Sequence, residues 1–245
     1  MSTYVFLGPT LPVDVARTIL DATYLPPAAM GDVCALVDRG ATVIALIDGL
    51  FERVPAVWHK EILYALSKGV RVLGASSMGA LRAAELHAFG MEGVGRIFEA
   101  YRDGVLEDDD EVAVDHASAE FHYRQISDPM VNIREAVRQA CGRELISEAT
   151  GAAIVREAKK LFYPERCWPA LAAAGRKLGL PEQELTALLQ FVREAKPNLK
   201  RDDALELLGK LAGAAAAMGS PDFDFQETSF WHKMQTHLQE RAQRS

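Results

Sequence analysis

Residues 71–86, RVLGASSMGALRAAEL, pass from a short apolar stretch through two serines into a stretch rich in alanine and leucine. The first part is typical of a buried strand, and the second part is typical of a helix. A strand that enters a helix through a tight turn of small residues is the repeating unit of an α/β protein. The stretch therefore predicts an α/β fold and puts Ser76 and Ser77 on the turn.

Two further apolar runs predict strands before this one. They span residues 3–7 and 42–47, and the third strand spans residues 70–73. Each run is nearly continuous, which is typical of strands buried on both faces of a mostly parallel sheet. The helical patterns between and after them predict an order β-α-α-β-α-β-α with right-handed crossovers. The expected helices in this part of the chain span residues 13–20, 29–40, 54–69 and 94–104.

The character of the chain changes near residue 130. One more strand is expected at residues 110–116, DEVAVDH, and almost only helical patterns follow. These patterns span residues 130–142, 148–162, 167–179, 181–195 and 202–219. We therefore predict an α/β core over residues 1–130 and a helical C-terminal region over residues 131–245.

Composition excludes several classes of protein. The net charge of −7 and the lack of a basic run argue against a nucleic-acid-binding surface. The three cysteines are far apart and support neither a disulfide framework nor a zinc site. The acidic run 107–111 lacks patterned ligands and is expected to be a solvated turn rather than a metal site. No metal is therefore expected. No signal peptide is recognised and no stretch approaches the roughly 20 apolar residues that span a bilayer, so we expect a cytoplasmic protein.

Polar or glycine-rich segments follow each of the three predicted strands. The first strand leads into Gly8-Pro9-Thr10, the second into Asp48-Gly49, and the third into residues 74–79. In an open parallel sheet, ligands bind in the crevice beyond the carboxyl ends of the strands. We therefore expect these segments to meet and to form the functional site.

Ser77 is the preferred nucleophile on the third segment. A strained strand-to-helix turn needs small residues two positions before and after the nucleophile. Around Ser77 these residues are Ala75 and Gly79, whereas one flank of Ser76 is Met78. Ser76 is then expected to cap the helix or to support the site. The alternative is that Ser77 is only a helix N-cap, as most serines before helices are. If it is catalytic, the N-terminal end of the following helix would stabilise an oxyanion.

Two residues on the helix before the third strand are candidates for the base. His59 and Lys60 both lie among apolar neighbours on their helix, and apolar surroundings favour the neutral amine, which can accept a proton. The alternatives are a core histidine and a lysine that extends to water. Because no motif positions an acid for a triad, although Asp48 is available, a serine-lysine pair is favoured. Arg82 either contacts an anionic substrate group or pairs with Glu85.

The chain also resembles a known family over residues 3–135. The segments that carry the resemblance are YVFLGPTLP (4–12), DATYLPPAAMGDV (21–33), IDGLFERVPAVWHKEIL (47–63), GASSMGALRAAEL (74–86), GVGRIFEAYRDGVLEDDDEVAV (93–114) and MVNIRE (130–135). In this order and nearly without gaps they are similar to the core of TfuA-like proteins.

This resemblance implies a role beside a YcaO enzyme in the thioamidation of peptide backbones, where sulfur replaces an amide oxygen. It implies that the protein releases sulfide from a thiocarboxylated ThiS-like carrier through Ser77 and Lys60, and that it also helps YcaO to engage the substrate peptide. No cofactor is expected for this step, since ATP would belong to YcaO. One alternative is a non-catalytic adaptor that binds YcaO and its peptide. Another, a nucleotide or small-molecule binder, is disfavoured because no phosphate-binding lysine follows the glycine turn.

Overall fold

A parallel sheet forms the centre of the N-terminal lobe. The computed structural model describes residues 2–50, 54–213, 223–229 and 231–236. Within these residues the strands are β1 (Thr3–Phe6), β2 (Thr23–Leu25), β3 (Val43–Leu46), β4 (Arg71–Ala75) and β5 (Glu92–Val94). They pair in parallel in the order β2-β1-β3-β4-β5, which confirms the predicted α/β class. The strand order reverses between β1 and β3, so the usual ligand crevice of such a sheet lies at their carboxyl ends.

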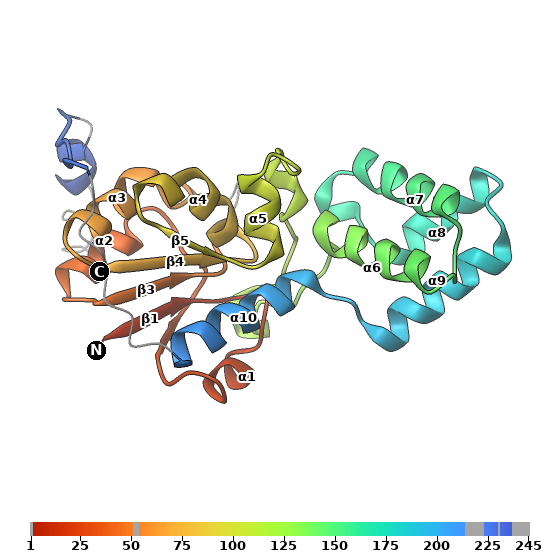
Figure 1. Ribbon diagram of the computed structural model, residues 1–245, viewed down its shortest axis with the longest axis horizontal. Helices are drawn as coiled ribbons and strands as arrows, with labels where there is room; N and C mark the ends of the chain where they lie inside the picture. The colour runs from red at the N-terminus through yellow and green to blue at the C-terminus, as the bar shows by residue number, and fades with distance from the viewer. Residues whose placement is uncertain (1, 51–53, 214–222, 230, 237–245) are drawn as a thin grey trace.

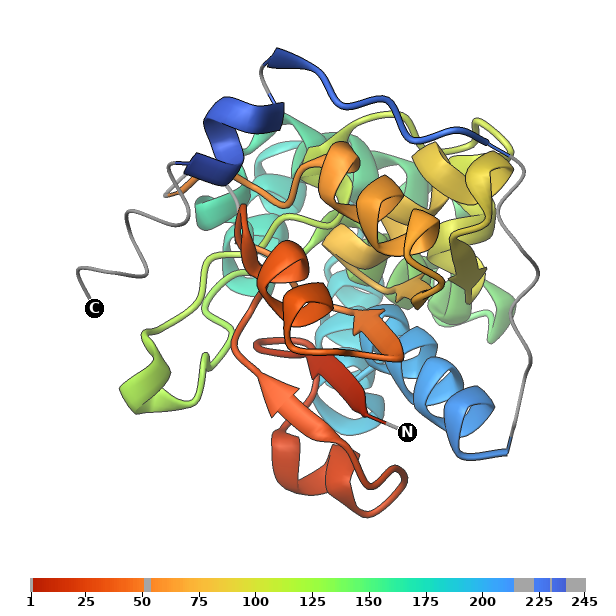
Figure 2. The ribbon, with the colours of Figure 1, turned by 90° about the vertical axis from the view of Figure 1, so that its left-hand side faces the viewer.

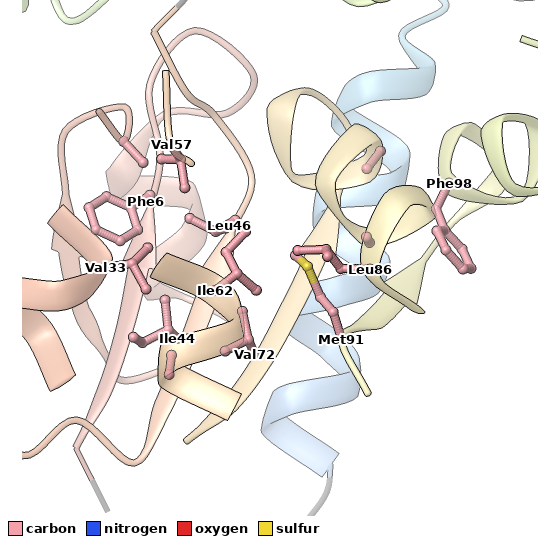
Figure 3. Close-up of a cluster of buried hydrophobic side chains, with 14 of the residues drawn as sticks. Phe6, Val33, Ile44, Leu46, Val57, Ile62, Val72, Leu86, Met91 and Phe98 are labelled. Atoms are coloured by element: carbon pink, nitrogen blue, oxygen red, sulfur yellow. The ribbon is translucent and has the colours of Figure 1, made fainter. Parts of the chain in front are cut away.

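Helices on one face of the sheet cover a large apolar cluster. They are α2 (Asp32–Asp38), α3 (His59–Ser67), α4 (Met78–Leu86) and α5 (Arg96–Arg102). Strand residues such as Phe6, Ile44 and Val72 point into this cluster and meet Ile62 and Leu86 from the helices (Figure 3). Burial of these side chains is the main force that holds the helices on this face.

The opposite face is covered by α1 (Val13–Arg17) and by α10 (Leu199–Gly213). Figure 1 shows α10 running back from the C-terminal helices along this face of the sheet. Strand residues here alternate with those of the first face, as the period of two in a strand requires. Ala45 and Leu73 pack with Leu207 and Leu208 of α10. The C-terminal half therefore supplies one layer of the α/β lobe, which a division at residue 130 does not anticipate.

A second lobe is made of α6 (Met130–Gly142), α7 (Glu148–Lys160), α8 (Trp168–Lys177) and α9 (Glu182–Ala195). It has an apolar cluster of its own, in which Ile133, Ile154, Leu171, Leu188 and Phe191 are buried. In Figure 1 this lobe lies beside the sheet, and α10 connects the two parts. The bounds of α6 agree with the predicted helix over residues 130–142.

Several local predictions need correction. Residues 110–116 do not form a strand: a 3-10 turn, η2 (Asp109–Glu111), is followed by irregular chain with one isolated bridge between His116 and Gln125. The guanidinium of Arg134 in α6 donates two hydrogen bonds to the Glu111 carboxylate, and this ion pair holds the segment against the helical lobe as a turn. The strands β2 and β5 were not predicted. The predicted helix over residues 202–219 extends beyond the described range at residue 213.

The remaining 3-10 turns are η1 (His87–Phe89), η3 (Ala119–Phe121) and η4 (Tyr163–Glu165). The aromatic tail, drawn in dark blue, lies on the side of the α/β lobe near α2 and α3 (Figure 2). There Trp231 is fully buried and its ring packs against that of Tyr64 in a tilted arrangement, with ring centroids 5.0 Å apart. The described part of the tail thus docks on the core. None of the helices in the described ranges has the length and apolar character needed to cross a membrane.

Candidate active site

The turn between β4 and α4 has a strained backbone. Ser76 has a φ of 70°, in the left-handed region that few residues other than glycine adopt. The N–H of Ser77 donates to the Ala75 carbonyl at 2.8 Å, which closes a tight three-residue turn around Ser76. Strain of this kind persists only where the surrounding structure enforces it, and it is concentrated at functional sites.

Two glycines allow the helix after this turn to sit directly on the strand ends. A Cβ atom on Gly79 would lie 1.8 Å from the Leu46 carbonyl oxygen, and one on Gly74 would lie 2.0 Å from the Gly79 carbonyl oxygen. The predicted need for a small residue at position 79 is confirmed. The Gly79 N–H donates to the Ile47 carbonyl at 3.3 Å, so it is not free to bind an oxyanion.

The three strand ends meet as predicted, and the carboxylate of Asp48 joins them. Its Oδ2 accepts the N–H groups of Gly8 at 2.8 Å and Thr10 at 3.1 Å, and its Oδ1 accepts the Thr10 hydroxyl at 2.6 Å. The Thr10 Oγ1 lies 3.4 Å from the Ser76 Oγ. A carboxylate can only accept hydrogen bonds, so the Thr10 hydroxyl uses its hydrogen for the bond to Asp48. In the contact with Thr10, the Ser76 hydroxyl is therefore the donor. Ser76 therefore supports the turn.

The Ser77 hydroxyl accepts a hydrogen bond from a lysine that was not predicted as the base. Lys200 of α10 donates from its Nζ to the Ser77 Oγ at 3.0 Å and to the Val112 carbonyl at 2.8 Å. The exposed fraction is 1% for Lys200 and 3% for Ser77. The Ser77 side chain makes no capping hydrogen bond to α4, so in the described structure the simple N-cap interpretation does not apply.

The environment of Lys200 favours its neutral form. Burial lowers the pKa of the amine to about 8, and the negative charge of Asp48 opposes this shift. The amine also lies at the N-terminal end of α4, where the helix dipole disfavours a positive charge. A buried amine with this pKa, hydrogen-bonded to a serine, is a suitable general base near neutral pH.

The predicted pairing of Ser77 with Lys60 is not what the structure contains. The Lys60 Nζ lies over the ring of Phe225, 4.8 Å from its centroid, so the docked tail covers the lysine. His59 is not at the turn either, because its Nε2 lies 2.8 Å from Glu85 at the surface. Lys200 therefore replaces Lys60 as the candidate base.

Arg82 has a structural set of partners. Its Nε donates to the Val57 carbonyl at 2.9 Å and its guanidinium pairs with Glu85 at 2.7 Å, which is the ion-pair alternative from the sequence. These contacts tie α4 to the chain before α3. Arg82 and Glu85 also line a cavity of about 510 Å³.

The acidic run was expected to be a solvated turn, but part of it forms an ion-pair network between the lobes in which Glu111 is buried. Glu111 accepts both Arg134 and Lys159 from the helical lobe, and Asp110 pairs with Lys159 and Arg166. No cluster of potential metal ligands occurs in the described ranges. The network fixes the segment that carries the Val112 carbonyl.

One signal in the sequence pointed to Lys200. Helices favour basic side chains near their C-terminal end and disfavour them at their start, where the dipole is positive. Lys200 is the second residue of α10, directly after Asn198 and Leu199. A lysine in this unfavourable place is unusual, but the sequence does not show which side chain it contacts.

A comparison with curated proteins gave no match. The family model described as TfuA-like protein matches residues 48–167. The match includes Asp48 and Ser77 at the carboxyl ends of the strands and stops before Lys200. Both residues of the candidate site that the sequence and the fold identify together thus lie inside the matched segment, and over residues 48–167 the chain is TfuA-like.

Proposed function

We propose that this protein hydrolyses a thiocarboxylated ThiS-like carrier and supplies sulfide to a YcaO enzyme, with Ser77 as nucleophile and Lys200 as base. The match to the TfuA-like family implies a YcaO partner in peptide thioamidation. The observation that carries the hydrolytic mechanism is the 3.0 Å hydrogen bond between the Lys200 amine and the Ser77 hydroxyl. This bond joins a nucleophile, which follows a strained turn, to a base on α10.

In the first step the neutral Lys200 amine removes the proton of Ser77 while the Oγ attacks the thiocarboxylate carbon. A C–O bond forms, the C–S bond breaks, and the proton passes from Lys200 to the departing sulfur. The carrier is left as an ester of Ser77, and the sulfur leaves as hydrosulfide, HS⁻, which takes up its second proton from the carboxylic acid that the next step forms. A thiocarboxylate suits this reaction because it combines an acyl carbon with a sulfur leaving group.

In the second step water attacks the ester carbon, and Lys200 accepts a proton of that water. The bond to the Ser77 Oγ breaks and the proton returns to the serine. The sum of the two steps is thiocarboxylate plus water giving carboxylate plus hydrogen sulfide. No oxidant or reductant is needed.

The oxyanion of each step would lie at the start of α4. In strand-to-helix nucleophile turns, the N–H of the residue after the nucleophile is an oxyanion donor. Here that residue is Met78, whose N–H has no acceptor among the described residues, whereas those of Ser77 and Gly79 are already bonded. The positive end of the α4 dipole adds to this stabilisation.

Burial of the dyad restricts what can reach it. Ser77 and Lys200 are almost wholly covered, so a folded carrier could reach Ser77 only with a narrow, extended tail. The chain around these two residues would have to move to admit that tail. The C-terminal tail of a ThiS-like carrier ends in glycine and is slim enough for such a route. Exclusion of bulk water also strengthens the electrostatic interactions in the site.

The test is sulfide release by the purified chain from the thiocarboxylated carrier, without YcaO and without ATP. The proposal predicts catalytic turnover by the wild type and none above background by Ser77→Ala. Ser67→Ala is the matched control, because Ser67 is at the end of α3 and its hydroxyl donates to the carbonyl of Tyr64 in the same helix. Sulfide release that is absent from the wild type, or unchanged in Ser77→Ala, would favour the adaptor.

A further inference from the structure

We infer that Asn132 of the helical lobe is a positioning residue that holds Lys200 against Ser77. The inference rests on the proposed function, since it concerns how the base of that reaction is oriented. It gives the helical lobe a role in catalysis, although none of its own helices contributes a reacting group.

The contact is direct and buried. Asn132 lies in the first turn of α6 with 6% of its surface exposed. Its Oδ1 accepts the backbone N–H of Lys200 at 3.1 Å, and its Nδ2 donates to the Oδ1 of Asn198 at 3.0 Å. The same oxygen of Asn198 accepts the N–H of Arg201 at 2.9 Å.

The two asparagines divide the capping of α10 between them. The first N–H groups of a helix have no acceptor within it, and one capping side chain ordinarily satisfies one of them. Asn198 precedes the helix and takes the N–H of Arg201, which leaves the N–H of Lys200 to Asn132. The bond from the second lobe is therefore made to the very residue whose side chain reaches Ser77.

A second contact fixes the same turn from the other lobe. Asp203, three residues after Lys200, accepts the N–H groups of Arg96 at 3.1 Å and Ile97 at 2.8 Å at the start of α5. A Cβ atom on Gly95 would lie 2.3 Å from the Asp203 Cγ, so the approach is close. Asp203 anchors α10 to the start of α5, and Asn132 then determines the orientation of the first turn of α10.

Removal of the Asn132 amide leaves the buried Lys200 N–H without an acceptor and frees Asn198 to move. The first turn of α10 can then rotate or fray, while Asp203 still retains the rest of the helix. The lysine amine would spend less time within reach of Ser77. Binding of the carrier, which Asn132 does not touch in the proposed site, would be unaffected.

The kinetic test compares Asn132→Ala with Ser147→Ala. Ser147 caps α7 in the same lobe and accepts the Thr150 N–H at 3.3 Å, so its loss weakens the lobe without involving Lys200. At a temperature where both variants are folded, Asn132→Ala is expected to lower kcat for sulfide release at least tenfold with KM within twofold. Ser147→Ala is expected to keep both constants. An unchanged kcat in Asn132→Ala, or an equal loss in Ser147→Ala, would overturn the inference.

A spectroscopic test does not depend on turnover. In the ¹⁵N- and ¹³C-labelled protein, the side-chain signal of Lys200 is assigned by its absence from Lys200→Met. Asn132→Ala should shift this signal and leave that of Lys60 in place, whereas Ser147→Ala should shift neither. If the wild type released no sulfide, the proposed function would fail while this shift still tested the positioning role. An unmoved Lys200 signal in Asn132→Ala would refute that role.

Discussion

Replacement of Lys200 by methionine should lower the rate of sulfide release about 10²- to 10⁴-fold without destabilising the fold near neutral pH. Burial lowers the pKa of this amine from 10.5 to about 8, so a charged Lys200 costs the folded state about 3 kcal/mol below pH 8. Methionine preserves most of the stem volume and removes this cost. It also removes the donor to the Val112 carbonyl at 2.8 Å, and a buried acceptor left without a partner costs about 1–3 kcal/mol.

The two effects have different pH dependences. The unfolded chain binds more protons than the folded chain between pH 8 and 10.5, so the stability of the wild type rises with pH over this range. At pH 7 the variant should therefore be as stable as the wild type or more stable by up to about 2 kcal/mol. Above pH 10.5 it should be less stable by about 1–3 kcal/mol, because only the lost hydrogen bond remains.

Urea unfolding of both proteins at several values between pH 7 and pH 10.5 measures this difference. The free energy of unfolding of the variant relative to the wild type should change by about 3 kcal/mol across the range. A difference that stays constant with pH would show that the Lys200 amine does not have a lowered pKa in the folded protein. The argument for Lys200 as a neutral base would then fail.

Three further substitutions distinguish residues that support the site from residues that take part in the reaction. Ser76→Ala removes only a 3.4 Å contact, so sulfide release should stay within about tenfold of the wild type; complete loss would make Ser76 the nucleophile. Asp48→Asn removes the charge that raises the pKa of Lys200, so the rise of kcat/KM with pH should move to lower pH, and an unmoved profile would exclude this coupling. Arg82→Ala loses the bonds to the Val57 carbonyl and to Glu85, so the free energy of unfolding should fall by about 1–3 kcal/mol while turnover of the folded protein persists; lost turnover at full stability would assign Arg82 to the substrate.

The parts of the fold that the sequence predicted are those encoded by local patterns. Nearly continuous apolar runs identified β1, β3 and β4, and the geometry of a parallel sheet then brought their carboxyl ends together. The strands β2 and β5 have only three residues each, which is the lower limit of strand length and too short to produce a pattern. Residues 110–116 had a strand-like composition, but ion pairs with the helical lobe decided their structure.

The base of the site depended on contacts that no local pattern contains. Lys200 is 123 residues from Ser77 in the chain, and the sequence predicts its helix but not the surface on which that helix docks. Lys60 has an apolar neighbour in the structure, but that neighbour belongs to the tail, because the Lys60 amine lies over the ring of Phe225. The sequence thus identified the nucleophile through its turn, whereas the choice between two lysines required the tertiary structure.

The most direct test of the account compares sulfide release by Lys200→Met and Lys60→Met from the same thiocarboxylated carrier. Each variant replaces one amine with an apolar side chain of similar length, and only Lys200 contacts Ser77. We expect a fall of about 10²- to 10⁴-fold for Lys200→Met, which is the usual contribution of a general base, and a rate within a few-fold of the wild type for Lys60→Met. Full activity in Lys200→Met, or the larger loss in Lys60→Met, would contradict the account.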